Sequence, residues 1–278
     1  MFRKRTGSIL CPSCGKLVGV AVDQCPNCGR RNPGMWGLTS VLGNVGRTVP
    51  FDQVVVGGTV FLYLCMLVVD PEHISLRLNL NLLAPSPESS FRFGATGPVP
   101  VLGLGRWWTV LSAGWLHANL LHIYFNLSWL RVLAPGVAEL YGQSRMVILY
   151  TVSSAFAFLL SSTMGPFLPF GAKYTVVGAS AAIFGLLGAL IWYGHATGSR
   201  TLRNQVWSWV VGGLVFGFLF PRMIDNWAHL GGFAGGYMAA HFLDPRKPER
   251  PVHVAGAVVC LVATVLAIVA SLIVPIPV

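Results

Sequence analysis

Residues 178–185 read GASAAIFG and open a long apolar run. Small residues recur at every fourth position of this run: Ala181, Gly185 and Ala189. This spacing places them on one face of a helix. A later apolar run, residues 227–243, carries Gly232 and Gly236 at the same spacing. Because small faces let two helices approach to backbone contact inside a membrane, we expect these two helices to pack tightly against each other.

The composition of the chain is that of a membrane protein. Of its 278 residues, 54% are hydrophobic and 10% are charged, and the mean hydropathy is +0.65, whereas a soluble domain carries about 25% charged residues. These values exclude a soluble globular chain, and they exclude disorder, which requires low hydrophobicity. Because a membrane span needs about 20 mostly apolar residues, the sequence predicts spans at 53–69, 116–133, 146–164, 178–196, 206–220, 227–243 and 252–275.

The formal net charge of +10 would suggest nucleic acid as a partner in a soluble protein. If all seven spans exist and the N-terminus is cytoplasmic, only five of the 19 basic residues lie outside: Arg77, Arg92, Arg106, Lys173 and Arg222. Basic residues concentrate in the cytoplasmic loops of membrane proteins. We therefore expect a multi-pass protein of the cell membrane, embedded in the lipid bilayer, with a cytoplasmic N-terminus, an outside C-terminus and no nucleic-acid partner.

The apolar runs divide the chain into four predicted parts: a small cytoplasmic domain (residues 1–35), a linker (36–52), a six-helix membrane domain (53–243) and an additional transmembrane helix (252–275). No secretory signal peptide is expected, because basic residues lead directly into a cysteine cluster. Residues 70–115, between the first two spans, are hydrophobic enough to lie in the membrane interface. Arg106 and the following tryptophans are typical of an anchor at the headgroup level, and an ordinary interfacial belt fits them equally well.

Four cysteines occur in two Cys-Pro-x-Cys-Gly knuckles near the N-terminus: Cys11, Cys14, Cys25 and Cys28. Two such pairs can bring four thiolates to one tetrahedral ion, and the glycine after each pair lets the backbone turn tightly. We expect structural zinc, with rubredoxin-like iron as the alternative metal. Two disulfides are disfavoured because cytosolic thiols stay reduced. Such a zinc ribbon needs its metal to fold, and we expect it to bind a protein partner or to position the N-terminal tail.

Three of the predicted spans carry polar groups, which are costly in a bilayer and therefore indicate function. His122 and Asn126 lie four residues apart on the second span, hence on one helical face, and His117 lies nearer the outer end of the same span. Ser180 opens the fourth span, and His229 lies near the outer end of the sixth. Since these three spans all enter from the outer side, the polar groups lie at similar depths.

A serine with a histidine in hydrogen-bond reach is the minimum for nucleophilic acyl transfer, since the imidazole takes the hydroxyl proton and returns it to the leaving amine. We expect Ser180 and His229 to form a dyad, because no carboxylate is placed to orient the histidine. His122, Asn126 and the backbone N–H of Ser180 would then hold the oxyanion. Taken alone, Ser180 is better explained as a helix cap, and Asn126 could simply join two helices.

The polar motifs resemble those of the rhomboid family of intramembrane serine proteases, over residues 50–243. The resemblance rests on three motifs in the family's order: His117-x4-His122-x3-Asn126, GASAAIFG at 178–185, and Ala228-His229-x2-Gly232-x3-Gly236. It implies an all-α polytopic membrane fold with a six-helix core, to which the seventh helix and the zinc ribbon are additions. It also implies an endopeptidase that cleaves within or beside the transmembrane segments of other proteins and needs no cofactor for catalysis.

The resemblance assigns a role to each site residue. Ser180 would be the nucleophile and His229 the general base, with His122 and Asn126 in the oxyanion site. Phe184 would pack beside the base, while His117 and Gly178 would line the site. Two residues depart from the family's pattern: Ala181 stands where the family usually has glycine, and Thr109 follows Trp108 where the family usually has arginine.

Two other functions remain open from the sequence. One is a catalytically inactive rhomboid-like pseudoprotease that binds membrane-protein helices. The retention of all four chemical groups of the site argues against it, because such proteins typically lose the nucleophile or the base. The other is a proton pathway through the three histidines, which the lack of an acidic residue on the remaining spans disfavours.

Overall fold

The computed structural model of the chain describes residues 7–11, 13–33, 50–76, 81–172, 174–221 and 223–275. Most of the predicted linker over residues 36–52 lies outside the described residues, as do three of the basic residues assigned to the outer side: Arg77, Lys173 and Arg222. In the N-terminal part, strand β1 (Ser8–Leu10) pairs antiparallel with β2 (Leu17–Gly19). Ile9 lies opposite Val18, and both pack against Cys11 and Cys25 in a small cluster.

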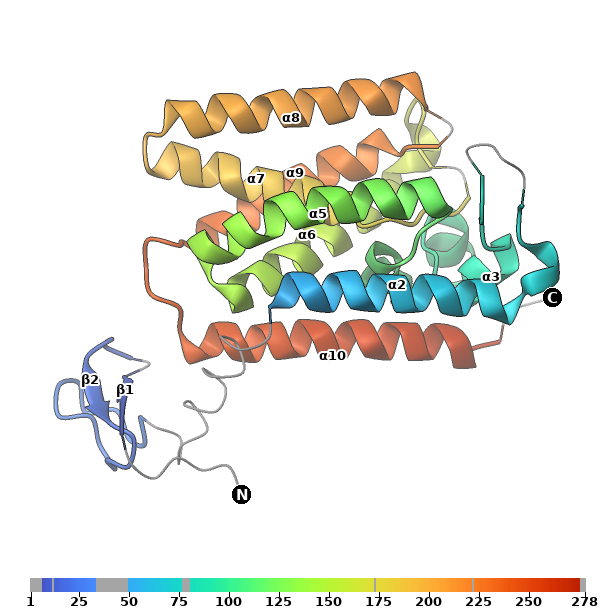
Figure 1. Cartoon of the computed structure of the whole chain (residues 1–278). Helices are drawn as coiled ribbons and strands as arrows, with labels where there is room; N and C mark the ends of the chain where they lie inside the picture. The colour runs from blue at the N-terminus through green and yellow to red at the C-terminus, as the bar shows by residue number, and fades with distance from the viewer. Residues whose placement is uncertain are drawn as a thin grey trace.

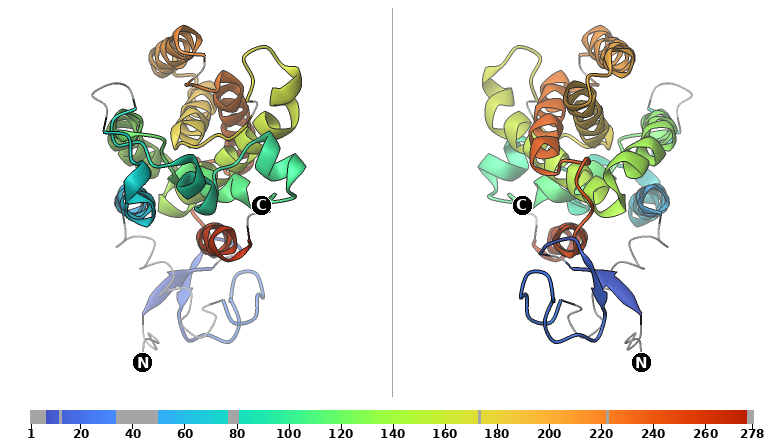
Figure 2. Two further views of the ribbon diagram at one scale, coloured as in Figure 1. Left: turned by 90° about the vertical axis from the view of Figure 1, so that its right-hand side faces the viewer. Right: turned by 90° about the vertical axis from the view of Figure 1, so that its left-hand side faces the viewer.

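The remainder of the described chain is mostly helical. A long helix lies over each predicted span: α2 (Phe51–Val69), α5 (Leu120–Tyr141), α6 (Gln143–Met164), α7 (Ser180–Ala196), α8 (Arg200–Leu219), α9 (Asn226–Phe242) and α10 (Pro251–Ile273). Their axes run roughly alongside one another (Figure 1), and end-on views place α8 and α10 at opposite edges of the bundle (Figure 2). Two helical stretches, Gln143–Phe167 and Pro251–Ile273, are long and apolar enough to cross a membrane. The seven-span topology stays a prediction.

Helix α7 lies at the centre of the bundle, where it contacts α5, α6, α8 and α9. A Cβ atom added at Gly232 would collide with the carbonyl oxygen of Ala181, and one added at Gly236 would collide with that of Gly185. The two backbones are therefore in direct contact, and the predicted tight packing of these helices is confirmed. This packing fixes the position of the residues that α7 and α9 carry toward the site.

The second predicted span, 116–133, differs from the helix that the structure has. Helix α5 begins at Leu120, because the Asn119 side chain caps it by accepting from the backbone N–H of His122 at 2.8 Å. It continues past the point where the prediction ends it and stops at Tyr141, before Gly142 with φ +87°. His117 therefore precedes the helix, and its predicted place on the span is wrong.

Two further boundary predictions are corrected by helix caps. Helix α8 begins at Arg200, well before residue 206, because the Ser199 hydroxyl accepts from the backbone N–H of Leu202 at 3.4 Å. In α7 the capping position is Ala179, and no side chain caps the helix. Ser180 is the first helical residue, so its interpretation as a helix cap is wrong.

The segment between α2 and α5 folds into short turns packed against the bundle: η2 (Pro71–His73), α3 (Pro87–Arg92), the π-helical turn η3 (Val99–Gly103), α4 (Thr109–Ser112) and η4 (Ala113–Trp115). Trp107 is 66% exposed, but Arg106 is only 2% exposed. The headgroup anchor predicted at Arg106 is therefore wrong. Its guanidinium points inward because it has a partner there, the Ser271 carbonyl of α10.

Candidate active site and metal site

The chain enters α7 along a short extended stretch, which the segment between α2 and α5 holds in place. Thr96 and Val176 exchange backbone hydrogen bonds of 3.1 and 2.6 Å. The backbone N–H of Gly178 donates to the carbonyl oxygen of Ala113 at 3.0 Å. These bonds determine where α7 starts and hence where the Ser180 side chain lies.

His122 and Ser180 lie on the same side of Gly178. A Cβ atom added at Gly178 would lie 2.7 Å from Cε1 and 2.8 Å from Nε2 of His122, and 3.5 Å from the Ser180 Oγ. Gly178 also has φ +138°, a conformation that side chains rarely adopt. Only glycine fits at this position, and its missing side chain leaves room for the His122 ring beside the serine.

Hydrogen bonding defines which nitrogen of His122 faces the serine. The ring's Nδ1 accepts from the backbone N–H of Ala118 at 3.4 Å, which places the proton of the neutral ring on Nε2. The Nε2–H group is therefore a donor directed at the Gly178 and Ser180 region. This is the arrangement that an oxyanion site needs.

His117 is fully buried beside His122, with the two ring centres 5.0 Å apart. Its Nε2 accepts from the backbone N–H of Ala179 at 3.4 Å, while its Nδ1 is buried without a partner. His117 thus holds the residue immediately before Ser180. The resemblance implies that His117 lines the site, but the sequence gives no sign of this backbone contact.

His229 on α9 stacks on Phe184 of α7, with ring centres 4.2 Å apart and planes 10° from parallel. Phe184 follows Ser180 by one helical turn and therefore lies on the same face of α7. The imidazole accordingly lies over the face that carries the serine hydroxyl. Within the described part of the chain, no hydrogen bond joins Ser180 to His229.

The carboxylate nearest to His229 in sequence serves α9 itself. Asp225 Oδ1 accepts from the backbone N–H groups of Trp227 at 2.9 Å and Ala228 at 3.1 Å, and Oδ2 accepts from the Ser161 hydroxyl. His229 is 7% exposed, and its Nδ1 is buried without a partner. Among the described residues, the imidazole is therefore stacked on the Phe184 ring and has no hydrogen bond to an acidic side chain.

Asn126 lies one turn after His122 on α5, is 5% exposed and has an amide Nδ2 that is buried without a partner. An unpaired buried amide is costly, and a ligand that accepts a hydrogen bond would remove that cost. The structure thus brings together His117, His122, Gly178 and Ser180, and separately brings His229 onto Phe184. For Asn126 it gives a free donor on the face that carries His122, but no contact with the serine.

Some residues that build the site had no clear signal in the sequence. Thr96 and Ala113 act through backbone groups, which any residue could supply. Gly97 is a partial exception, since it has φ +132° and an added Cβ would collide with the carbonyl oxygen of Tyr174. The sequence alone does not show which segment Gly97 approaches.

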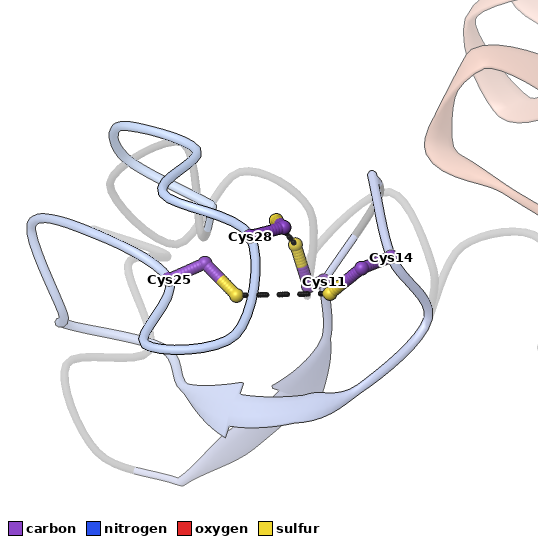
Figure 3. A group of neighbouring side chains, drawn as sticks. All are labelled: Cys11, Cys14, Cys25 and Cys28. Atoms are coloured by element: carbon purple, nitrogen blue, oxygen red, sulfur yellow. Dashed lines mark hydrogen bonds between the residues drawn. The ribbon is translucent and has the colours of Figure 1, made fainter.

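The four cysteine sulfurs of the N-terminal part converge on one point (Figure 3), and all lie within 4.8 Å of one another. Cys11 and Cys28 are 3.7 Å apart, as are Cys14 and Cys25. These distances exclude disulfides, whose sulfurs lie about 2.05 Å apart. They fit a tetrahedral ion, because a metal–sulfur distance of about 2.3 Å places the sulfurs about 3.8 Å apart.

The backbone of the two knuckles also favours a metal. Gly15 and Gly29 both have φ +70°, so the predicted tight turn after each pair is confirmed. Burial alone would raise the pKa of the Cys11 thiol, but hydrogen bonds from the backbone N–H groups of Cys14 and Ser13 and from the Cys25 and Cys28 thiols together lower that pKa to about 6. A thiolate is the form that binds metal, so the module is suited to hold a structural ion.

The part of the chain that contains the site is similar to known proteins. Residues 104–246 match the family model of the rhomboid domain. Rhomboid protease GluP of Bacillus subtilis is 31% identical over 166 residues, which are 59% of this chain and 31% of that protein. Rhomboid-like protease 1 of Toxoplasma gondii is 31% identical over 61% of this chain and 58% of its own length. RHOMBOID-like protein 1 of Arabidopsis thaliana is 32% identical over 56% of this chain and 40% of its own length. The chain therefore spans less than two thirds of these relatives.

Proposed function

The chain belongs to the rhomboid family, and from that premise we propose that it is an intramembrane serine endopeptidase. Its substrates are other membrane proteins, which it cleaves within or beside their transmembrane segments. It works as a multi-pass protein with the N-terminus in the cytoplasm and the C-terminus outside. One observation carries the proposal: Ser180 heads α7 without serving as its cap, next to the Nε2–H donor of His122.

The chemistry uses Ser180 and His229 as a dyad. The Ser180 oxygen attacks the carbonyl carbon of the scissile peptide bond while the His229 ring takes the hydroxyl proton, and the same ring then gives that proton to the leaving amine. A water molecule, deprotonated by His229, releases the acyl group from the serine. Stacking on Phe184 supports this role, because it holds the imidazole plane through both proton transfers.

The tetrahedral intermediate carries negative charge on the former carbonyl oxygen. His122 Nε2–H and the buried amide of Asn126 are the side-chain donors for that oxygen, and the N-terminus of α7 adds backbone N–H groups and the positive end of its dipole. Loss of one such donor costs about 10²–10³ in kcat. His117 supports the site by fixing the residue before the nucleophile.

The cysteine module holds zinc as a structural ion through Cys11, Cys14, Cys25 and Cys28 in this proposal. The sulfur positions suit a tetrahedral ion, and zinc is the commonest metal in sites of four cysteines. The ion supplies folding free energy to a module that has a very small apolar cluster. It takes no part in peptide hydrolysis.

The decisive experiment compares wild-type protein with Ser180→Ala on a transmembrane substrate whose helix contains glycine and proline. Both are purified and assayed in liposomes. We expect product from the wild type only, with cleavage inside or next to the substrate's span by mass spectrometry. Ser128→Ala is the matched control, because among the described residues the Ser128 hydroxyl has one hydrogen bond, to the carbonyl oxygen of Tyr124 on its own helix.

A serine-reactive fluorophosphonate probe separates the protease from its alternative. Labelling of wild type, with none on Ser180→Ala, shows an activated nucleophile even if the chosen substrate is poor. An inert Ser180, together with unchanged binding of the substrate helix, would instead establish the pseudoprotease that binds helices without cutting them.

A further inference from the structure

The segment between α2 and α5 meets α10 through a buried cation. The Arg106 Nη2 donates to the Ser271 carbonyl oxygen at 2.7 Å, and the guanidinium carbon lies 4.6 Å from the centre of the Phe91 ring. Ser271 lies in the last turn of α10, where carbonyl groups lack a backbone partner in the helix. A cation at this end is also favoured by the helix dipole. Arg106 therefore acts as a cap on α10.

Two more residues of the segment surround the same serine. The Trp108 Nε1 donates to the Ser271 Oγ at 3.0 Å, and Ser271 is 1% exposed. Gly94 has φ +99°, and a Cβ added there would lie 2.7 Å from the Ser271 Oγ and collide with the Ser112 hydroxyl. The last turn of α10 is thus held by two polar contacts within a largely apolar region, while Nε and Nη1 of Arg106 are buried without a hydrogen-bond partner among the described residues.

The same segment reaches the active site on its other side. The Thr109 hydroxyl lies 2.8 Å from the Arg106 carbonyl oxygen and 3.0 Å from the Thr96 hydroxyl. Thr96 pairs with Val176, and the carbonyl oxygen of Ala113 accepts from the backbone N–H of Gly178. Hydrogen bonds, joined by the covalent structure of Arg106 and Thr96, therefore connect α10 to the stretch that leads into Ser180.

The opposite end of α10 is fixed as well. Glu249, two residues before the helix, accepts from the backbone N–H groups of Ser144 at 3.0 Å and Arg145 at 3.2 Å, and thereby caps α6. The Arg145 guanidinium donates to the carbonyl oxygens of Asp244 at 2.7 Å and Lys247 at 2.9 Å. The chain is therefore anchored just before α10 begins and again at its last turn.

We infer that α10 positions the active site, and that Arg106 is the positioning residue through which it acts. The inference rests on the proposed protease function. Arg106 touches neither the serine nor its histidine; it holds the segment over residues 94–113 against α10, and that segment holds the stretch before Ser180. Loss of the contact displaces the serine hydroxyl relative to His122 and His229.

The test uses paired variants of the full chain and two readouts. Arg106→Ala is compared with Arg92→Ala, whose exposed guanidinium only pairs with Glu88. Gly94→Ala is compared with Gly103→Ala, where an added Cβ meets nothing within 4 Å. The readouts are kcat and KM on a transmembrane substrate, and amide hydrogen exchange over residues 174–180 measured by mass spectrometry.

We expect Arg106→Ala and Gly94→Ala to lower kcat by on the order of tenfold or more with KM nearly unchanged, because small displacements of a nucleophile are costly. Exchange over residues 174–180 should rise in both and stay at the wild-type rate in the two controls. Arg106→Lys, which can still donate to the Ser271 carbonyl oxygen, should recover most of the lost kcat.

A milder pair covers the case in which Arg106→Ala does not fold. Trp108→Phe and Ser271→Ala both delete the hydrogen bond between these two side chains, and Ser271→Ala also deletes the bond from the Ser271 Oγ to the Ala267 carbonyl oxygen. Because one bond is shared, the double variant should lose less than the sum of the two single effects. An active wild type whose kcat and exchange are unmoved by these variants would overturn the inference. If the wild type cleaves nothing, the proposed function fails separately, and exchange over residues 174–180 still decides whether α10 positions that stretch.

Discussion

Gly178 shows at the scale of one residue how little room the candidate active site has. In Gly178→Ala the new methyl would lie 2.7 Å from the His122 ring on a backbone with φ +138°. The ring would have to move away from Ser180, so we expect kcat/KM to fall by about a hundredfold or more. The measurement is cleavage of a transmembrane substrate, with the melting temperature recorded in parallel.

Gly198→Ala is the matched control for Gly178→Ala. Gly198 also has a left-handed backbone, with φ +72°, but an added Cβ there meets nothing within 4 Å. It therefore carries a backbone penalty of about 1–2 kcal/mol without any clash. Equal loss of cleavage in both variants would show that backbone strain, and not the His122 ring, explains the requirement for glycine.

Ala181, where the family usually has glycine, is a second residue whose effect can be predicted. Its side chain is 1% exposed and packs in a small cluster with Ala113, Ala157 and Phe158, so the methyl group fills the core and does not crowd the site. We expect Ala181→Gly to leave kcat/KM within about threefold and to lower stability by about 1 kcal/mol, since glycine is the poorer helix former. A tenfold gain in kcat/KM would instead mean that the methyl obstructs the oxyanion site.

At the scale of elements, the contact between α7 and α9 sets the relation between the serine and the histidine. A Cβ atom added at Gly188 would collide with the carbonyl oxygen of Phe233 and lie 2.9 Å from the backbone nitrogen of Tyr237. Because backbone cannot yield as a side chain can, Gly188→Ala should destabilise the fold by about 2–3 kcal/mol and separate Ser180 from His229. Thermal unfolding in detergent and probe labelling of Ser180 would measure the two effects.

Gly212→Ala is the control for that element, since an added Cβ on α8 at this position meets nothing within 4 Å. Alanine is also the better helix former there, so the control should be neutral or slightly stabilising. A Gly188→Ala variant as stable as Gly212→Ala would contradict direct backbone contact between α7 and α9.

The elements also show what the sequence could and could not predict. The length of an apolar run and the four-residue spacing of small residues are local patterns. The approximate positions of the helices and the packing of α7 on α9 were therefore predictable from the sequence. The start of α5 depends on one hydrogen bond from His122 to Asn119, which apolar length alone does not reveal. Arg106 was misplaced because its partner, Ser271, is 165 residues away, and no local pattern joins them.

On the scale of the whole molecule, the N-terminal module and the helical bundle should respond separately to loss of metal. The module's apolar cluster is too small to fold it alone, so we expect about one zinc ion per chain and loss of the module's fold with a strong chelator. Proteolysis of the residues before α2 should then accelerate. The bundle should keep its melting temperature, and the rate of substrate cleavage should stay within about twofold of that of the untreated protein. Elemental analysis and limited proteolysis provide the measurement.

Cys14→Ser and Cys65→Ser form the matched pair for the metal. Cys14 has its sulfur 3.7 Å from that of Cys25 in the four-cysteine cluster, whereas Cys65 lies within α2. The first variant should lose most of the bound zinc, and the second should retain it. Iron in the purified wild type would identify iron, and not zinc, as the metal of this site. A protein without metal whose N-terminal module still resists proteolysis would contradict the proposed metal site.

The side of the membrane to which the site opens can be predicted from the position of the chain's last helix. Arg106 joins the last turn of α10 to the segment that holds the start of α7, so the C-terminal end of α10 and Ser180 lie toward the same side of the bundle. The distribution of basic residues predicts that this side is outside. In intact cells, a reporter after residue 275 should be accessible to an added protease, whereas a reporter before residue 7 or between α9 and α10 should be protected. An inaccessible C-terminal reporter with an exposed N-terminal one would reverse the orientation, and the site would then open toward the cytoplasm.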